Sequence, residues 1–141
     1  MHTSPSSAAT TAAPPRGRAA RAALYVLLAL LTLALAVTGG AKVIGADFMA
    51  ANMAEIHFGT APTIVIGALE LLAAAGLWTR RYRTLSLAVF LLILAGGVGA
   101  HWGYGHPAER IAPPFAIAAL TFAAMWLDRG RALWDFVLRR A

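Results

Sequence analysis

The chain has 141 residues, of which 60% are hydrophobic and only 13% are charged. An ordinary soluble domain is about 45–50% apolar and about 25% charged, and a small domain cannot bury so much apolar surface away from water. The absence of cysteine excludes disulfide frameworks, thiolate metal sites and dithiol redox chemistry. The composition therefore predicts an integral membrane protein.

Four apolar segments are long enough to cross a bilayer as helices, because about 20 residues at about 1.5 Å rise each span a hydrocarbon core of about 30 Å. Their connections are short, which favours an all-α fold, an antiparallel bundle of four transmembrane helices within residues 21–128. Pro113 and Pro114 fit the first turn of the fourth span, where the missing N–H groups would have no helical acceptor. A cleavable signal peptide is a weaker interpretation of the first span, since such peptides have apolar cores of about 7–15 residues. The spans cover residues 22–41, 61–79, 84–101 and 111–127.

The basic residues lie mainly on one side of this bundle. Ten of the twelve Lys and Arg residues precede the first span, lie between the second and third, or follow the fourth. The positive-inside bias then places both termini in the cytoplasm, with residues 1–20 as a disordered basic tail and residues 129–141 as a second basic tail. The net charge of +6 indicates contact with anionic lipid headgroups rather than nucleic acid. Asp128 and Asp135, beside the tail arginines, are interpreted as solvated charges.

Residues 42–60 are too polar to span the membrane and too apolar to remain free in water. Their apolar side chains recur at steps of three to five residues, which predicts a helical continuation of the first span or an amphipathic helix at the outer interface. The residues concerned are Val43, Ile44, Phe48, Met49, Met53 and Ile56.

Glu70 lies near the centre of the second span. A charged carboxylate at the bilayer centre costs at least about 2.5–3.5 kcal/mol, so Glu70 must face the bundle interior and either pair with a cation or hold a proton. Lys42 and His101 end the first and third spans on the same side and are the candidate partners. We expect Lys42, Glu70 and His101 to form a buried polar cluster that lines a ligand pocket open to the outside. The alternative is a hydrogen-bond network that only locks the helices together.

Three further residues near the outer surface are secondary candidates for the site: His57, Trp102 and His106. Histidines there suggest a metal or haem, but no helix carries an HxxxH or HxxEH pair and the chain has no cysteine. No metal site is therefore predicted. No catalytic residue is predicted either, because the sequence has no nucleophile–base arrangement, phosphate-binding glycine loop or EF-hand pattern.

Three stretches of the sequence resemble the DoxX-like family of small bacterial four-helix membrane proteins. They are GGAKVIGADFMAANMAEIHFG, IGALELLAAAGLW and GGVGAHWGYGHP. The family pattern places a Gly/Lys pair at the end of helix 1, an acidic residue followed by leucine in helix 2, and a small residue followed by histidine at the end of helix 3. The matching residues here are Gly40 with Lys42, Glu70 with Leu71, and Ala100 with His101. The resemblance covers residues 25–127 and implies a multi-pass protein of the bacterial plasma (inner) membrane.

The resemblance also implies a role beside redox enzymes. The family takes its name from an association with the membrane subunits of a thiosulfate:quinone oxidoreductase, and a eukaryotic relative resembles a receptor-assembly chaperone. We therefore expect an accessory or scaffold subunit without catalytic activity of its own that binds a quinone or lipid-like molecule near Glu70. Its expected partners are membrane lipids and another membrane protein or a second copy. Two alternatives stay open: a proton-coupled transporter of small cations that uses Glu70, and a membrane-protein assembly chaperone.

Overall fold

A computed structural model describes residues 17–138, with side chains as far as Arg129, and over this range the chain forms helices and short connections without a strand. The predicted tails therefore fall largely outside the described residues, although Arg18 already belongs to the first helix and the last helix continues past Asp128. The helices are α1 (Arg18–Ile44), α2 (Asp47–Glu55), α3 (Thr60–Trp78), α4 (Arg83–Gly103) and α5 (Ala108–Leu138). Four helices, α1, α3, α4 and the Ala108–Arg129 part of α5, are long and apolar enough to cross a membrane.

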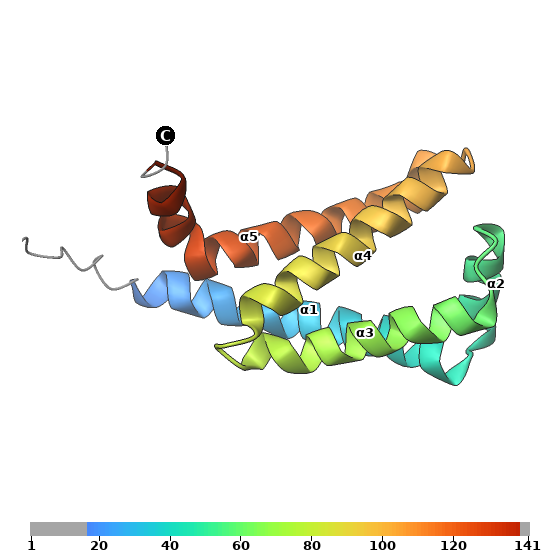
Figure 1. The fold of residues 1–141 in the computed structure, drawn as a ribbon, viewed down its shortest axis with the longest axis horizontal. Helices are drawn as coiled ribbons and strands as arrows, with labels where there is room; N and C mark the ends of the chain where they lie inside the picture. The colour runs from blue at the N-terminus through green and yellow to red at the C-terminus, as the bar shows by residue number, and fades with distance from the viewer. Residues whose placement is uncertain (1–16, 139–141) are drawn as a thin grey trace, which may run out of the picture.

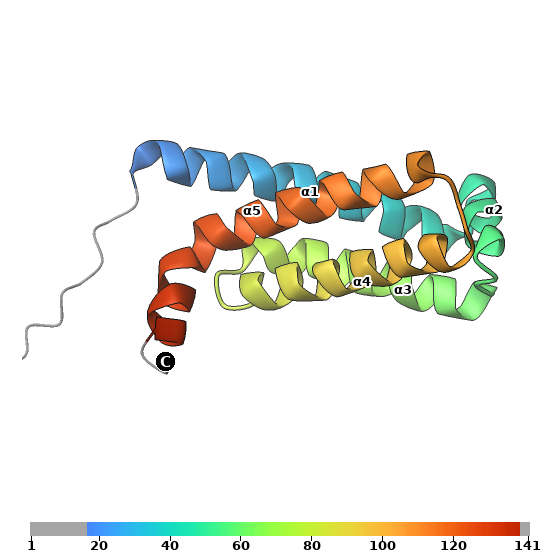
Figure 2. The same ribbon diagram turned by 90° about the horizontal axis from the view of Figure 1, so that it is seen from above.

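The four long helices lie side by side along the molecule (Figures 1 and 2). The chain runs along α1 to the end where α2 lies, returns along α3, runs out again along α4 and returns along α5. Helix α1 contacts α3 and α5, and α4 contacts the same two helices, so the four close a ring. We call the end that holds the start of α1 and the α3–α4 connection the basic end, and the opposite end the α2 end.

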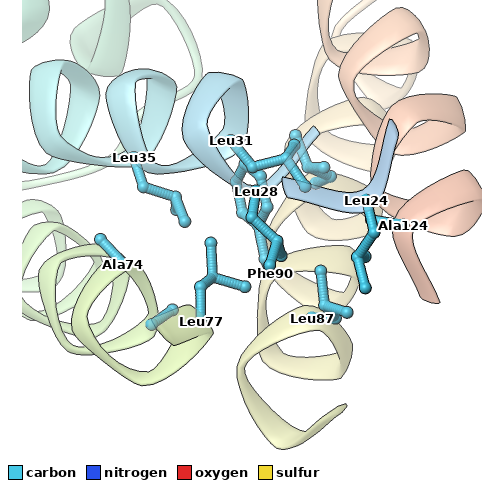
Figure 3. Packing of buried hydrophobic residues seen from close by; sticks show 11 residues of the cluster. Leu24, Leu28, Leu31, Leu35, Ala74, Leu77, Leu87, Phe90 and Ala124 are labelled. Atoms are coloured by element: carbon cyan, nitrogen blue, oxygen red, sulfur yellow. The ribbon is translucent and has the colours of Figure 1, made fainter. Parts of the chain in front are cut away.

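The hydrophobic core lies in the half of the bundle nearest the basic end. Figure 3 shows the packing of its side chains from close by. Helix α1 contributes Leu24, Leu28, Leu31 and Leu35, whose spacing places them on one helical face. They pack against buried side chains from the other three long helices, including Ala73, Ala74, Leu77, Leu87, Phe90, Leu94 and Ala124. Large apolar side chains on the outer faces are exposed, as a lipid-facing surface requires, among them Val26, Leu33, Leu72, Leu85 and Leu92.

Helices α1 and α3 approach most closely at two glycines. A Cβ atom on Gly39 would lie 2.8 Å from the carbonyl oxygen of Gly67, and one on Gly67 would lie 2.7 Å from the carbonyl oxygen of Gly39. Only residues without a side chain allow two backbones to meet in this way. Lys42 packs over Gly67 and Glu70 packs over Gly39, so the same crossing brings the two charged residues together.

The segment between α1 and α3 contains one separate helix. Helix α1 continues to Ile44 and ends at Gly45, whose φ of 68° is left-handed and suits a residue without Cβ. Helix α2 then follows, with Met49 buried beneath it. The structure thus contains both a continuation of the first span and a distinct short helix.

Helix α5 begins earlier than the sequence predicts. Because its first residue is Ala108, Pro113 and Pro114 lie beyond the first turn rather than within it. Proline has no N–H group, so the carbonyl groups of Glu109 and Arg110 lose the helical donors that these positions would otherwise supply.

Candidate functional site

Lys42 and Glu70 form an ion pair inside the bundle. The Lys42 Nζ atom lies 2.8 Å from Oε1 of Glu70 and 2.9 Å from Oε2, and the two side chains are only 8% and 4% exposed. The hydroxyl of Thr38 lies 2.9 Å from Oε2 of Glu70 and 2.9 Å from the carbonyl oxygen of Ala34. The hydroxyl has one proton, so it can donate a hydrogen bond to only one of these two oxygens at a time. The carboxylate is thus neutralised and hydrogen-bonded, which is what burial of a charge requires.

A cavity of about 610 Å³ borders this ion pair and extends toward the α2 end. All five helices contribute to its wall, which is mainly apolar. Thr38, Lys42 and Glu70 supply polar groups, as do Asn52, His101, Glu109 and Arg110. Small-molecule sites in proteins have this volume and this combination of apolar walls with a few polar groups.

His101 shares the cavity with Lys42 and Glu70 but makes its hydrogen bond elsewhere. Its Nδ1 atom lies 2.7 Å from Nδ1 of His106. Two ring nitrogens at this distance require that one carries a proton and the other accepts it. The structure thus joins two of the three predicted cluster residues directly and places the third on the same cavity wall, paired with a histidine of the α4–α5 connection.

Polar and aromatic contacts hold α2 against the start of α5. Arg110 Nη1 lies 2.6 Å from Oε2 of Glu55, and both side chains are partly exposed. The ring of His57 stacks on Tyr104, with centroids 4.9 Å apart and planes 20° apart. His57 reaches this position with a φ of 56°, an uncommon conformation for a residue with a side chain. These contacts lie at the α2 end, where Arg110 also borders the cavity.

None of the three secondary candidates is among the residues that line the cavity, but two of them lie close together at the α2 end. His57 and His106 both lie beside Tyr104, whose ring centroid is 6.4 Å from that of His106. Trp102 is 72% exposed and is not part of the cavity wall. An exposed tryptophan near the end of a membrane-spanning helix is typical of an interfacial anchor.

The interpretation of Asp128 as a solvated charge is wrong. Its Oδ1 atom lies 3.1 Å from Nη1 of Arg83, and the two side chains are 12% and 9% exposed. Arg83 also donates from Nε to the carbonyl oxygen of Leu77 at 2.8 Å. This second buried ion pair ties the α3–α4 connection to α5 near the basic end, away from the cavity. The side chain of Asp135 lies outside the described residues.

The cavity brings several kinds of polar group together. An ammonium, a carboxylate, a hydroxyl and an imidazole are all present, whereas no serine, cysteine or threonine lies within hydrogen-bonding distance of a histidine base among residues 17–129. Over the same range, no three His, Asp or Glu side chains gather as metal ligands would. The arrangement fits a largely apolar ligand with a few hydrogen-bonding groups.

Comparison with known proteins agrees with this architecture. The profile of the DoxX-like family matches residues 26–124. Neither a search of curated proteins nor a search of solved structures found a match. The match includes all or part of each long helix and both residues of the Lys42–Glu70 pair, and it covers well over half of the sequence. The chain is therefore a multi-pass membrane protein that belongs to the DoxX-like family.

Proposed function

We propose that this protein is an accessory subunit of a bacterial plasma-membrane redox complex and that its cavity binds a quinone or a closely similar lipid-like ring compound. The observation that carries the proposal is the cavity of about 610 Å³, which has apolar walls and a buried ion pair within a membrane-spanning bundle. A ligand of a few hundred Å³ that partitions into the bilayer matches both the volume and the walls.

The polar groups of the cavity match the hydrogen-bonding pattern of a quinone. A quinone ring carries two carbonyl acceptors on opposite sides and is otherwise apolar. The Lys42 ammonium has three N–H donors, and the Glu70 oxygens accept two of them, which leaves one for a ligand carbonyl. The His101 imidazole, which shares the wall, supplies a second polar group for the opposite carbonyl. Phe90, on the same wall, offers an apolar surface for the ring.

Two other functions have less support from the same contacts. A proton-coupled cation exchanger needs a carboxylate that loses and gains its proton freely, whereas Glu70 is held by Lys42 at 2.8 Å. An assembly chaperone would use a small-residue surface to hold another chain, whereas the small residues Gly39 and Gly67 contact each other within this chain.

The orientation of the protein is part of the proposal. The positive-inside bias puts the basic end in the cytoplasm, so the cavity opens toward the outer leaflet. Helix α2 would then lie as an amphipathic cover at the outer interface, with Met49 turned to the cavity and Phe48 exposed.

Two glycines of α4 allow a matched test of quinone binding. Gly97 borders the cavity and Gly99 does not, and a Cβ atom on either would meet nothing within 4 Å. Gly97→Leu should therefore fill part of the cavity, while Gly99→Leu adds the same bulk outside it. The variants are purified in mild detergent from membranes containing quinone, and the bound quinone is extracted and quantified by chromatography. We expect near-stoichiometric quinone with the unmodified protein and Gly99→Leu, and little with Gly97→Leu. Equal quinone in all three would contradict the proposal.

The accessory role needs a separate measurement. Purification in mild detergent, followed by mass spectrometry of bound proteins, should recover a quinone-reactive oxidoreductase together with this chain. A chain that binds quinone but purifies alone would contradict the accessory role and leave the ligand proposal standing.

A further inference from the structure

A second hollow lies on the outside of the bundle, between α3 and α4, and shares no residue with the central cavity. It is a groove of about 410 Å³ that runs up to the α3–α4 connection. Gly76 lets α3 and α4 pack closely at the groove, because a Cβ atom there would collide with the hydroxyl of Ser86. Its walls are mostly apolar, and they are formed by Leu69, Leu72, Ala73, Ala75, Gly76, Leu85 and Val89, with Thr79, Tyr82 and Ser86 nearer the connection.

The groove faces the surroundings of the bundle rather than its interior. Leu72 and Leu85, on opposite walls, are 70% and 64% exposed. Both α3 and α4 are long and apolar enough to cross a membrane, so the medium that fills a groove between them is the hydrocarbon of the bilayer.

Two exposed arginines lie in the α3–α4 connection, at one end of the groove. Arg80 and Arg81 stand between Thr79 and Tyr82, which both belong to the groove wall, and both arginines are exposed. The Arg81 guanidinium lies 5.6 Å from the centre of the Tyr82 ring. No carboxylate among the described side chains forms a salt bridge with either arginine, whereas neighbouring Arg83 forms one with Asp128.

We propose that this groove is a binding site for an anionic phospholipid of the surrounding membrane. One acyl chain lies along the apolar walls of the groove, and the phosphate group contacts Arg80 and Arg81. Charge complementarity selects the ligand: phosphatidylcholine offers the same acyl chains but carries a positive group beside its phosphate, so it gains less from the two arginines. The site differs from the proposed quinone site in position and in ligand charge.

The proposal is tested by lipid binding to the delipidated full-length protein in detergent. The probes are dioleoyl-phosphatidylglycerol, dioleoyl-phosphatidylcholine and glycerol phosphate, and bound ligand is counted by native mass spectrometry across a concentration series. Phosphatidylglycerol should bind more tightly than phosphatidylcholine, and glycerol phosphate should bind weakly because it lacks acyl chains. Each arginine near the headgroups contributes about a fivefold factor, so Arg80→Gln with Arg81→Gln should weaken phosphatidylglycerol binding about 25-fold.

A matched control removes the same charge elsewhere on the basic end. Arg18 and Arg21 are exposed at the start of α1 and do not border the groove, so Arg18→Gln with Arg21→Gln should change the affinity less than twofold. Ala75→Phe, which narrows the groove itself, should weaken both lipids. Equal binding of the two lipids would overturn the proposal, as would equal losses in the two double-arginine variants. Tight binding of glycerol phosphate would assign the arginines to a soluble anion instead.

Discussion

The ion pair between Lys42 and Glu70 makes a quantitative prediction about stability. Lys42→Met removes the ammonium but keeps most of the apolar stem, so the Glu70 carboxylate is left with the Thr38 hydroxyl alone. Both charged side chains are more than nine-tenths buried. Removing one partner of such a pair typically costs about 3–5 kcal/mol, because the other charge stays buried without compensation. We expect a loss of this size in the free energy of unfolding.

The double variant distinguishes the loss of the ion pair from the loss of side-chain packing as the cause of the destabilisation. Glu70→Gln keeps the size of the side chain and a hydrogen-bonding oxygen for Thr38, so combined with Lys42→Met it leaves no buried charge at this position. The double variant should recover most of the stability that Lys42→Met loses, since replacing a buried pair by uncharged side chains is often neutral or stabilising. Unfolding by denaturant in detergent micelles, followed by circular dichroism, measures all three variants.

The exposed ion pair between Arg110 and Glu55 is the internal control. Its side chains are 48% and 39% exposed, so Arg110→Met should cost no more than about 1 kcal/mol. The reasoning would be refuted by a Lys42→Met loss as small as that of Arg110→Met. It would also be refuted by losses in Lys42→Met and Glu70→Gln that simply add in the double variant, because additivity means that the two residues do not interact.

Two further predictions concern the helix crossing and the orientation. Gly67→Ala places a Cβ atom 2.7 Å from the Gly39 carbonyl oxygen, so it should separate α1 from α3 and lower the melting temperature, whereas Gly40→Ala, which meets nothing within 4 Å, should not. Equal melting temperatures for the two variants would show that the crossing tolerates a side chain. A reporter fused after Arg83 should lie in the cytoplasm, and one fused after His106 should lie outside the membrane. Any other result contradicts the orientation.

The sequence predicts much of the fold and part of the site because hydrophobic segments and buried charges follow strong rules. Four apolar segments of sufficient length define four spans, which the structure contains. A carboxylate at the centre of a span needs a cation, and Lys42 is near enough in depth to supply one. The partner of His101 could not be predicted in this way. His106 reaches it only because the connection folds back at Gly105, whose φ is 68°.

Other contacts could not be predicted, because residues of the same types occur at many similar positions without making such contacts. Arg83 belongs to a run of arginines that flank a span, so nothing in the sequence distinguishes it as the partner of Asp128, 45 residues away. Thr38 is one of several threonines in apolar helices, where the hydroxyl commonly bonds to the backbone. The two glycines at the α1–α3 crossing cannot be told from the other eleven in the chain. Tertiary packing decides each of these cases.

The depth difference between Lys42 and Glu70 has a consequence for how the chain enters the membrane during synthesis. Lys42 is close to the end of α1, where a long side chain can extend to the water at the surface. The Glu70 side chain cannot reach the water, because it lies in the middle of α3. A solitary carboxylate at this depth costs about 2.5–3.5 kcal/mol during insertion. Insertion of α3 beside α1 would remove this cost, because the Lys42 ammonium then neutralises the Glu70 carboxylate.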